Sequence, residues 1–307
     1  MLTCPSSDHQ TSASRNLPPE SKTPTPLTIV TFCFLGIRKD RPDDYYVRPL
    51  SEFVERLSTA TTRPRLEIYA NSRAKKYLAR LPFGNISYCE PEELMSAVWD
   101  DPAALDVYQK LIRHNPTHRE SAQARFRRLT AVWLGKVEAT RRAIASGAEA
   151  CFWVDAGHWV SYQCQHDFSR YRSKLQNIVR PEGLSERLLE AASRFGRVGQ
   201  HFEGIHSHFH MPIEWMYEHA KAINPKLPRP LPFYSATLWL VHKRCMESFF
   251  ERMRHWWLHL INHKQAGVDE NALTMTLWEQ NWHTLSYEEW VKVLGGAPIA
   301  PAAPTKP

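Results

Sequence analysis

The chain has 307 residues, of which 43% are hydrophobic and 11% aromatic, and this composition excludes global disorder. Its formal net charge of +7 favours anionic partners, such as nucleotides, phosphorylated glycans, nucleic acid or an anionic membrane surface, without selecting one of them. No apolar stretch approaches the roughly 20 residues of a transmembrane helix, and the amino terminus lacks the apolar core of a signal peptide.

The six cysteines are scattered, without a Cys-x-x-Cys pair. This pattern favours buried thiols in a reducing cytoplasm over disulfides or structural zinc. We therefore expect a cytoplasmic protein, and the positive charge leaves attachment to a membrane surface open. Composition also predicts disordered tails at residues 1–26, which are rich in Ser, Thr and Pro, and at residues 295–307, which are mostly Gly, Ala and Pro.

The first half of the body alternates between strand and helix patterns. Apolar runs predict strands at residues 27–35, 66–70, 85–89 and 150–154, and helical spacing predicts helices at about residues 46–57, 91–110 and 122–146. Pro49 suits the first turn of the first of these helices. Strands separated by helices form mainly parallel sheets with right-handed crossovers. The pattern therefore predicts an α/β fold, with one mainly parallel sheet and flanking helices.

The second half has a different pattern. It predicts one strand at residues 235–241 and helices at residues 185–194, 243–261 and from 271 to 280. We therefore divide the body into two parts, at residues 27–160 and 161–294.

Asp155 follows the continuously apolar run of residues 150–154 and precedes Ala156 and Gly157. Such a run predicts a strand buried on both faces of a parallel sheet, and ligands of open α/β sheets bind beyond the carboxyl ends of the strands. A carboxylate there can meet a metal ion or a sugar hydroxyl. The alternative is an Asp that caps the next helix or closes a turn.

Lys136 falls inside the apolar stripe of the predicted helix at residues 122–146, where a charged residue is unexpected. It must extend its ammonium group to solvent at the edge of the stripe, pair with a carboxylate, or point into an active cleft. The spacing leaves these alternatives open. The apolar stripe itself consists of Phe126, Leu129, Val132, Trp133, Val137, Thr140 and Ile144.

Asp269 and Glu270 come just before a predicted helix. Capping and the helix macrodipole both favour carboxylates at a helix start, so a structural role is one interpretation. The other interpretation is a general base, or a carboxylate that binds an acceptor substrate, on the far wall of a cleft.

His206, His208 and His210 share one face if their segment is extended, and three imidazoles on one face could bind zinc. The segment lacks the aspartate of the His-x-His-x-Asp-His metallohydrolase pattern, and loop histidines beside a cleft are commoner than metal ligands. A zinc site here, and a metallohydrolase built on it, is the least favoured interpretation.

Several short blocks resemble the HtrL/YibB family of bacterial glycosyltransferase-like proteins. The most specific is Trp133-Leu134-Gly135-Lys136, followed by Phe152-Trp153-Val154-Asp155-Ala156-Gly157. The others are the Thr-Ile-Val-Thr strand with the Arg-rich loop and Asp-Asp-Tyr-Tyr helix start that follow it, and residues 267–270. The resemblance covers roughly residues 27–280, through these blocks alone. It implies a GT-A-like, Rossmann-type fold, with a nucleotide-sugar-binding half at residues 27–160 and an acceptor-binding half at residues 161–294.

The chain departs from the pattern of such enzymes at two positions. Gly157 stands where the second Asp of the Asp-x-Asp metal-binding signature would be, which puts metal dependence in doubt. Gly135 replaces the serine expected before Lys136.

The resemblance implies a glycosyltransferase that moves a sugar from a nucleotide-sugar donor to a glycan or another hydroxyl-bearing acceptor. In that reaction the leaving diphosphate gains negative charge, which a metal or basic side chains must meet. Asp155, with Gly157 beside it, would hold Mn²⁺ or Mg²⁺, or else the ribose or sugar of the donor. Lys136 would contact the diphosphate or orient Asp155.

Arg38 and Arg41, in the loop after the first strand, are further candidates for the diphosphate, and the alternative for both is a surface role. Asp269 or Glu270 would accept the proton of the acceptor hydroxyl if the reaction inverts the sugar configuration. Trp159, Trp239 and Trp282 could stack on a sugar, although most tryptophans of a chain are core residues.

Two other classes remain open. One is a catalytically silent relative that binds a nucleotide or a glycan. The other is a glycosyltransferase directed to nucleic acid, which the +7 charge permits but no aromatic and basic recognition motif supports. The sequence names neither the donor, the acceptor nor the oligomeric state.

Overall fold

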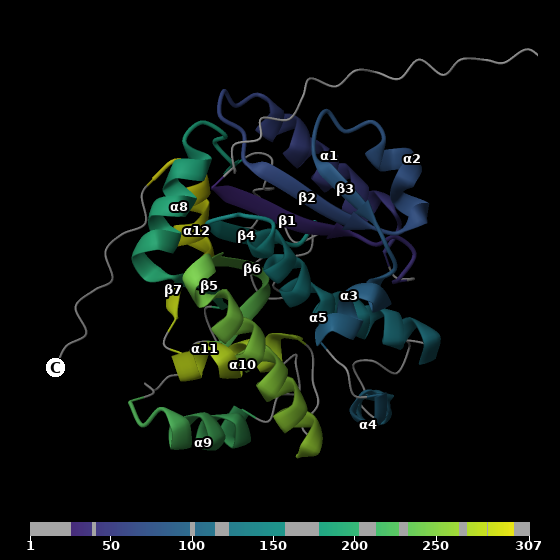
Figure 1. Cartoon of the computed structure of the whole chain (residues 1–307), viewed down its shortest axis with the longest axis vertical. Coiled ribbons are helices and arrows are strands. Elements are labelled where there is room, and N and C mark those ends of the chain that lie inside the picture. The colour runs from purple at the N-terminus through teal and green to yellow at the C-terminus, as the bar shows by residue number, and fades with distance from the viewer. Residues whose placement is uncertain are drawn as a thin grey trace, which may run out of the picture.

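The computed structural model describes residues 26–38, 41–98, 102–113, 123–156, 178–202, 213–226, 233–263, 269–280 and 282–297. Its strands form one seven-stranded sheet in the order β3-β2-β1-β4-β6-β5-β7 (Figure 1). The strands are β1 Leu27–Cys33, β2 Arg65–Ala70, β3 Asn85–Tyr88, β4 Ala150–Val154, β5 Arg197–Phe202, β6 Phe233–His242 and β7 His283–Leu285. The predicted α/β fold is therefore confirmed.

The sheet is mainly parallel, as predicted. Strands β3, β2, β1 and β4 pair parallel with one another, and β7 pairs parallel to β5. The exception is β6, which runs antiparallel to both β4 and β5. Because β4 pairs with β6, one continuous sheet spans both parts of the chain.

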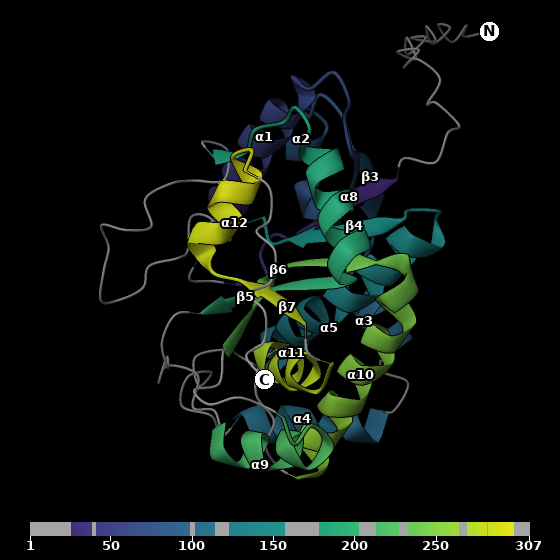
Figure 2. The same ribbon diagram turned by 90° about the vertical axis from the view of Figure 1, so that its left-hand side faces the viewer.

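Helices cover both faces of the sheet (Figures 1 and 2). One core cluster involves α1 Asp44–Ser58, α2 Lys75–Leu78, α8 Leu184–Phe195 and α12 Tyr287–Leu294. The other involves α3 Pro91–Val98, α4 Pro102–Arg113, α5 Gln123–Ala145, α9 Ile213–Ile223, α10 Lys243–Asn262 and α11 Asp269–Gln280. Alternation along β1 places Ile29 in the first cluster and Val30 in the second, which is why this strand is apolar throughout.

Several features differ from the sequence prediction, which did not include helices α2, α9 and α12. The predicted helix at residues 91–110 is two helices, α3 and α4. Pro49 lies inside α1, because that helix begins earlier, at Asp44. Strands β5 and β7 were not predicted: β5 lacks an apolar run and shifts register between Gly199 and Gln200. A Cβ at Gly199 would lie 2.7 Å from Leu277 Cδ2, so this glycine allows β5 and α11 to approach closely.

The order of the strands reverses at β1. From β1 the chain moves outward to β2 and β3, and it returns through α5 to β4 on the other side of β1. The parallel strands β1 and β4 therefore end side by side at the point of reversal. In open α/β sheets this is the crevice in which ligands bind.

Two further expectations can be compared with the fold. Among the described cysteines, Cys33, Cys89, Cys151 and Cys245 are free thiols. No helix in the described ranges combines the length and the hydrophobicity needed to cross a membrane.

Candidate functional site

A cleft of about 130 Å³ lies where β1 and β4 end. Its walls come from the loop after β1, from α5, and from the residues that follow β4. Arg38, Arg41, Lys136 and Asp155 all line it. The structure thus brings together four of the site residues proposed from the sequence, from three separate segments of the chain.

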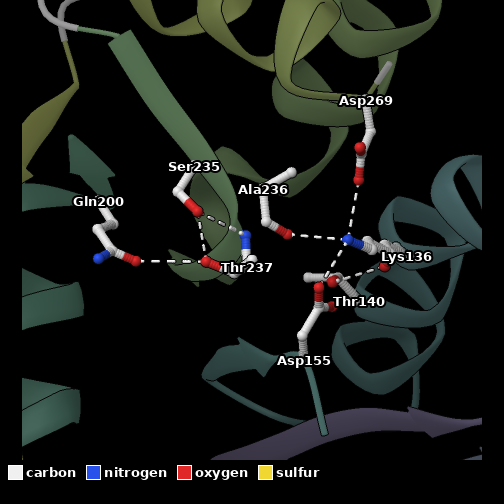
Figure 3. A network of polar contacts seen from close by, with 8 residues as sticks. All are labelled: Lys136, Thr140, Asp155, Gln200, Ser235, Ala236, Thr237 and Asp269. Carbon is white, nitrogen blue, oxygen red and sulfur yellow. Dashed lines mark hydrogen bonds and ion pairs between the residues drawn. The ribbon is translucent and has the colours of Figure 1, made fainter. Parts of the chain in front are cut away.

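Lys136 is the centre of the site. Its Nζ lies 3.1 Å from Asp155 Oδ2 and 2.8 Å from Asp269 Oδ2, and it donates a 3.1 Å hydrogen bond to the carbonyl oxygen of Ala236. Figure 3 shows the lysine reaching from α5 into the space between the two aspartates. Its side chain is only 5% exposed, so it does not extend to solvent at the edge of the stripe. Of the three alternatives that the sequence left open for Lys136, the structure shows pairing with carboxylates, at the edge of a cleft.

The carboxylates keep Lys136 charged. Burial alone would lower the pKa of this lysine, but the charges of Asp155, Asp269 and Glu270 raise it above its usual value. The Nζ atom also lies 5.7 Å from the centre of the Trp153 ring, whose face favours a cation. Lys136 is therefore a fixed ammonium ion at neutral pH.

Asp155 is the more accessible of the two aspartates. Its side chain is 28% exposed and lines the cleft, whereas that of Asp269 is 4% exposed. Burial raises the pKa of Asp155 to about 6, with Lys136 opposing the shift and Asp269 adding to it. The backbone N–H of Asp155 donates to the carbonyl of Thr237 on β6. This carboxylate is thus anchored to the sheet and still available to a ligand.

Asp269 and Glu270 occupy the first turn of α11, which begins two residues earlier than predicted. The side chain of Asp269 pairs with Lys136, so its contacts extend beyond its own helix. Burial and the charge of Asp269 raise the pKa of Glu270 well above its usual value, and a hydrogen bond to Asp269 contributes. The raised pKa favours the protonated form of Glu270.

The loop after β1 is held in place by contacts with the end of β2. Asn71 accepts from the backbone N–H of Leu35 at 3.2 Å and donates to its carbonyl at 2.9 Å. Gly36 has a φ of +72°, which favours glycine at this turn. These contacts support the backbone from which Arg38 enters the cleft.

Arg41 packs against two tyrosines. Its guanidinium carbon lies 4.6 Å from the centre of the Tyr45 ring, and it hydrogen-bonds Tyr46. Burial raises the pKa of Tyr46, against the opposing charges of Arg41 and Arg38. These aromatic contacts limit the conformational freedom of the Arg41 side chain. Its guanidinium group therefore loses less entropy on binding an anion than that of a surface arginine without such contacts.

A second polar group lies on β5 and β6, beside the Lys136 cluster (Figure 3). Ser235 and Thr237 share a hydrogen bond, and Thr237 Oγ1 donates to Gln200 Oε1 at 3.4 Å. Gln200 is only 1% exposed. These side chains satisfy one another within the sheet, at the register shift of β5.

Sequence reasoning missed several contributors to the site. Trp133 and Tyr46 line the cleft, and the carbonyl of Ala236 accepts from Lys136. The position of Trp133, one helical turn before Lys136, was a usable signal for the tryptophan. No sequence signal identifies the Ala236 carbonyl, because any residue provides that atom.

Some proposed residues are not part of the site. Trp239 and Trp282 are 1% and 6% exposed, so their rings are core and cannot stack on a sugar. Gly157 and Trp159 lie outside the described residues, as do His206, His208 and His210.

Comparison of the chain with protein-family models and with curated proteins found no match.

Proposed function

We propose that this protein is a glycosyltransferase, which moves a sugar from a nucleotide-sugar donor to a hydroxyl-bearing acceptor such as a glycan. The observation that carries the proposal is the Lys136–Asp155–Asp269 cluster, of which Lys136 and Asp155 line a cleft at the strand-order reversal of the sheet. Nucleotides bind at this position in many doubly wound α/β folds. We further propose a GT-A-like arrangement and membership of the HtrL/YibB family, because the blocks of resemblance contain Lys136 and Asp155.

The charges in the cleft suit a nucleoside diphosphate. Arg38, Arg41 and Lys136 supply three cationic groups, and Asp155 supplies one carboxylate. In glycosyl transfer the negative charge on the diphosphate grows as the sugar leaves, so cations fixed beforehand stabilise the transition state more than the ground state. Arg38 and Arg41 contact the diphosphate in this scheme, and Lys136 holds Asp155 in position.

A divalent cation fits beside Asp155. Mg²⁺ is commonly held by one or two carboxylates together with substrate phosphates and water, and Asp155 offers a partly exposed carboxylate. Such an ion would neutralise charge on the leaving diphosphate. The other role for Asp155 is to accept a hydrogen bond from a hydroxyl of the donor. Dependence of activity on Mn²⁺ or Mg²⁺ distinguishes these roles.

Asp269 is the residue we assign as proton acceptor for the acceptor hydroxyl, in an inverting reaction. The raised pKa of Glu270 favours its protonated form, which cannot accept the proton. The ion pair with Lys136 orients the Asp269 carboxylate toward the side of the site on which Asp155 lies.

The test is a panel of nucleotides and nucleotide sugars, each with and without Mn²⁺, read by thermal shift and by product formation. A donor at a hundred times its Kd should stabilise the fold by about 2.7 kcal/mol. With the donor identified, Asp155→Asn should lower turnover by about 100-fold or more, because it removes the charge but keeps the shape. Asp106→Asn is the matched control, since Asp106 is exposed on α4 and pairs with Lys110.

The outcomes separate the candidates. Nucleotide binding without product would indicate a catalytically silent relative, and wild-type turnover by Asp155→Asn would reduce Asp155 to a structural ion-pair partner. Recovery of Asp155→Asn at high Mn²⁺ would identify Asp155 as a metal ligand. Absence of binding to every member of the panel would contradict the proposal.

A further inference from the structure

Three histidines from two helices meet at one end of the molecule, apart from the residues that line the cleft. His219 lies on α9, and His259 and His263 lie one turn apart at the end of α10. Figures 1 and 2 both place α9 beside this end of α10. One ring nitrogen from each of the three lies within 4.8 Å of those of the other two.

Hydrogen bonds fix which nitrogen two of these rings present. His219 Nδ1 lies 2.8 Å from the carbonyl oxygen of Trp215, and His263 Nδ1 lies 2.9 Å from that of His259. A carbonyl oxygen only accepts hydrogen bonds, so Nδ1 of each ring donates, and the neutral form of each ring has its lone pair on Nε2. Metal-binding histidines show this arrangement, in which the second ring nitrogen donates to a backbone carbonyl.

The third ring offers a nitrogen without a partner. His259 Nε2 is buried, and no hydrogen-bond partner for it exists among the described residues. A buried polar atom left unpaired in this way is costly, and a ligand that binds it removes the cost.

We propose that His219, His259 and His263 form a binding site for a divalent transition-metal ion, with Zn²⁺ the expected occupant. Three imidazoles are a zinc ligand set, and zinc sites with three protein ligands keep a fourth position for water or another ligand. His263 is exposed, so solvent reaches this site from the side of His263. The metal would clamp α9 to the end of α10.

A tetrahedral zinc ion would require the three imidazole rings to move slightly closer together. Zn–N distances of about 2.0–2.1 Å place tetrahedral ligand nitrogens roughly 3.3 Å apart, which is closer than the 4.8 Å limit seen here. The rings of His259 and His263 have centres 4.2 Å apart, whereas that of His219 lies 5.3 Å and 5.5 Å from them. The closure therefore falls mainly on His219, which is only partly buried.

The experiment titrates Zn²⁺ into the full chain, without an affinity tag, after dialysis against a chelator. We expect one tight site per chain, and a rise in melting temperature when it is filled. His219→Gln and His263→Gln should each weaken binding at least 10-fold and remove the thermal shift. X-ray absorption of the loaded protein should show three imidazoles around the metal.

Two controls make the result specific. His255→Gln changes an exposed histidine of α10 one turn before His259, and it should bind Zn²⁺ as wild type does. A variant with His206, His208 and His210 all changed to Gln should also keep the site. The two test variants replace partly buried or exposed residues, so if one fails to fold the other still carries the test. Wild-type affinity in a folded test variant, loss of the site in either control, or no tight site in the wild type would overturn the proposal.

Discussion

Lys136 Nζ lies 2.8 Å from Asp269 Oδ2, and this ion pair joins α5 to the first residue of α11. The two side chains are 5% and 4% exposed, so water compensates neither charge to a useful degree. Asp155 adds a second carboxylate on the same ammonium group. The site therefore depends on contacts between residues that are far apart in the sequence.

Lys136→Met should destabilise the fold strongly. The substitution keeps most of the side-chain volume but leaves Asp155 and Asp269 without their cation, and removing one partner of a buried ion pair costs about 3–5 kcal/mol. Urea unfolding measures this change. The control is Lys243→Met, because Lys243 and its partner Glu149 are 52% and 46% exposed, and an exposed pair contributes about 0–1 kcal/mol. Equal effects of the two substitutions would show that the Lys136 cluster is not a tightly coupled group.

The stability of the fold should depend on pH through Asp155. Its pKa rises from 3.8 to about 6 on folding, so between these values the folded chain binds more protons than the unfolded chain. The free energy of unfolding should therefore fall as pH rises from 4 to 6, and this contribution should be constant above 6.

The variant Asp155→Asn has no titrating group at position 155, so comparing it with wild type separates the contribution of Asp155 from those of other groups. The difference in unfolding free energy between wild type and Asp155→Asn should decrease by about 2 kcal/mol from pH 4 to pH 6, a value below the full linkage because the side chain is 28% exposed. Urea titrations at a series of pH values measure the difference. A difference independent of pH would mean that the pKa of Asp155 is the same in both states.

Substitutions of Asp269 and Glu270, the two carboxylates of α11, should have unequal effects on the rate of sugar transfer. Burial raises the pKa of Glu270 and so favours its neutral form, which Glu270→Gln mimics with an uncharged hydrogen-bond donor, and activity should stay within about threefold of wild type. Asp269→Asn removes the proposed base, and losses of about 10²–10⁴-fold are typical of general-base substitutions. Initial rates of the two variants, measured with the identified donor, show which carboxylate the reaction needs. The reverse order of effects would assign the base to Glu270.

Gly135→Ser should destabilise the packing of α5 on α3. A Cβ at position 135 would lie 2.9 Å from Leu94 Cβ, so the two helices would have to move apart. Overpacking of this kind typically costs about 1–3 kcal/mol. Ala145→Ser, at the exposed end of α5, is the control and should change the unfolding free energy by less than about 0.5 kcal/mol. The close approach also explains why glycine occupies a position at which the resemblance led us to expect serine. If Gly135→Ser were as stable as the control, the explanation would be wrong.

The sequence by itself determined the elements with strong local signals. The apolar runs of β1, β2 and β4 identified these strands and their parallel arrangement, because a strand buried on both faces is apolar at every position. Lys136 was identified by being out of place in an apolar stripe, and Asp155 by its position after a buried strand. Both signals are local, and both residues line the cleft.

Only the tertiary structure decided how these residues combine. Sequence spacing left Lys136 three alternatives, and its contacts with Asp155 and Asp269 depend on how α5 packs on the sheet and on where α11 begins. Strand β5 has no apolar run and is held by its pairing with β6, so its existence is a property of its neighbours. The histidine trio of α9 and α10 is likewise invisible to spacing, because His219 and His259 become neighbours through helix packing alone. Local patterns specify elements, whereas ion pairs and metal sites are assembled from contacts of high sequence separation.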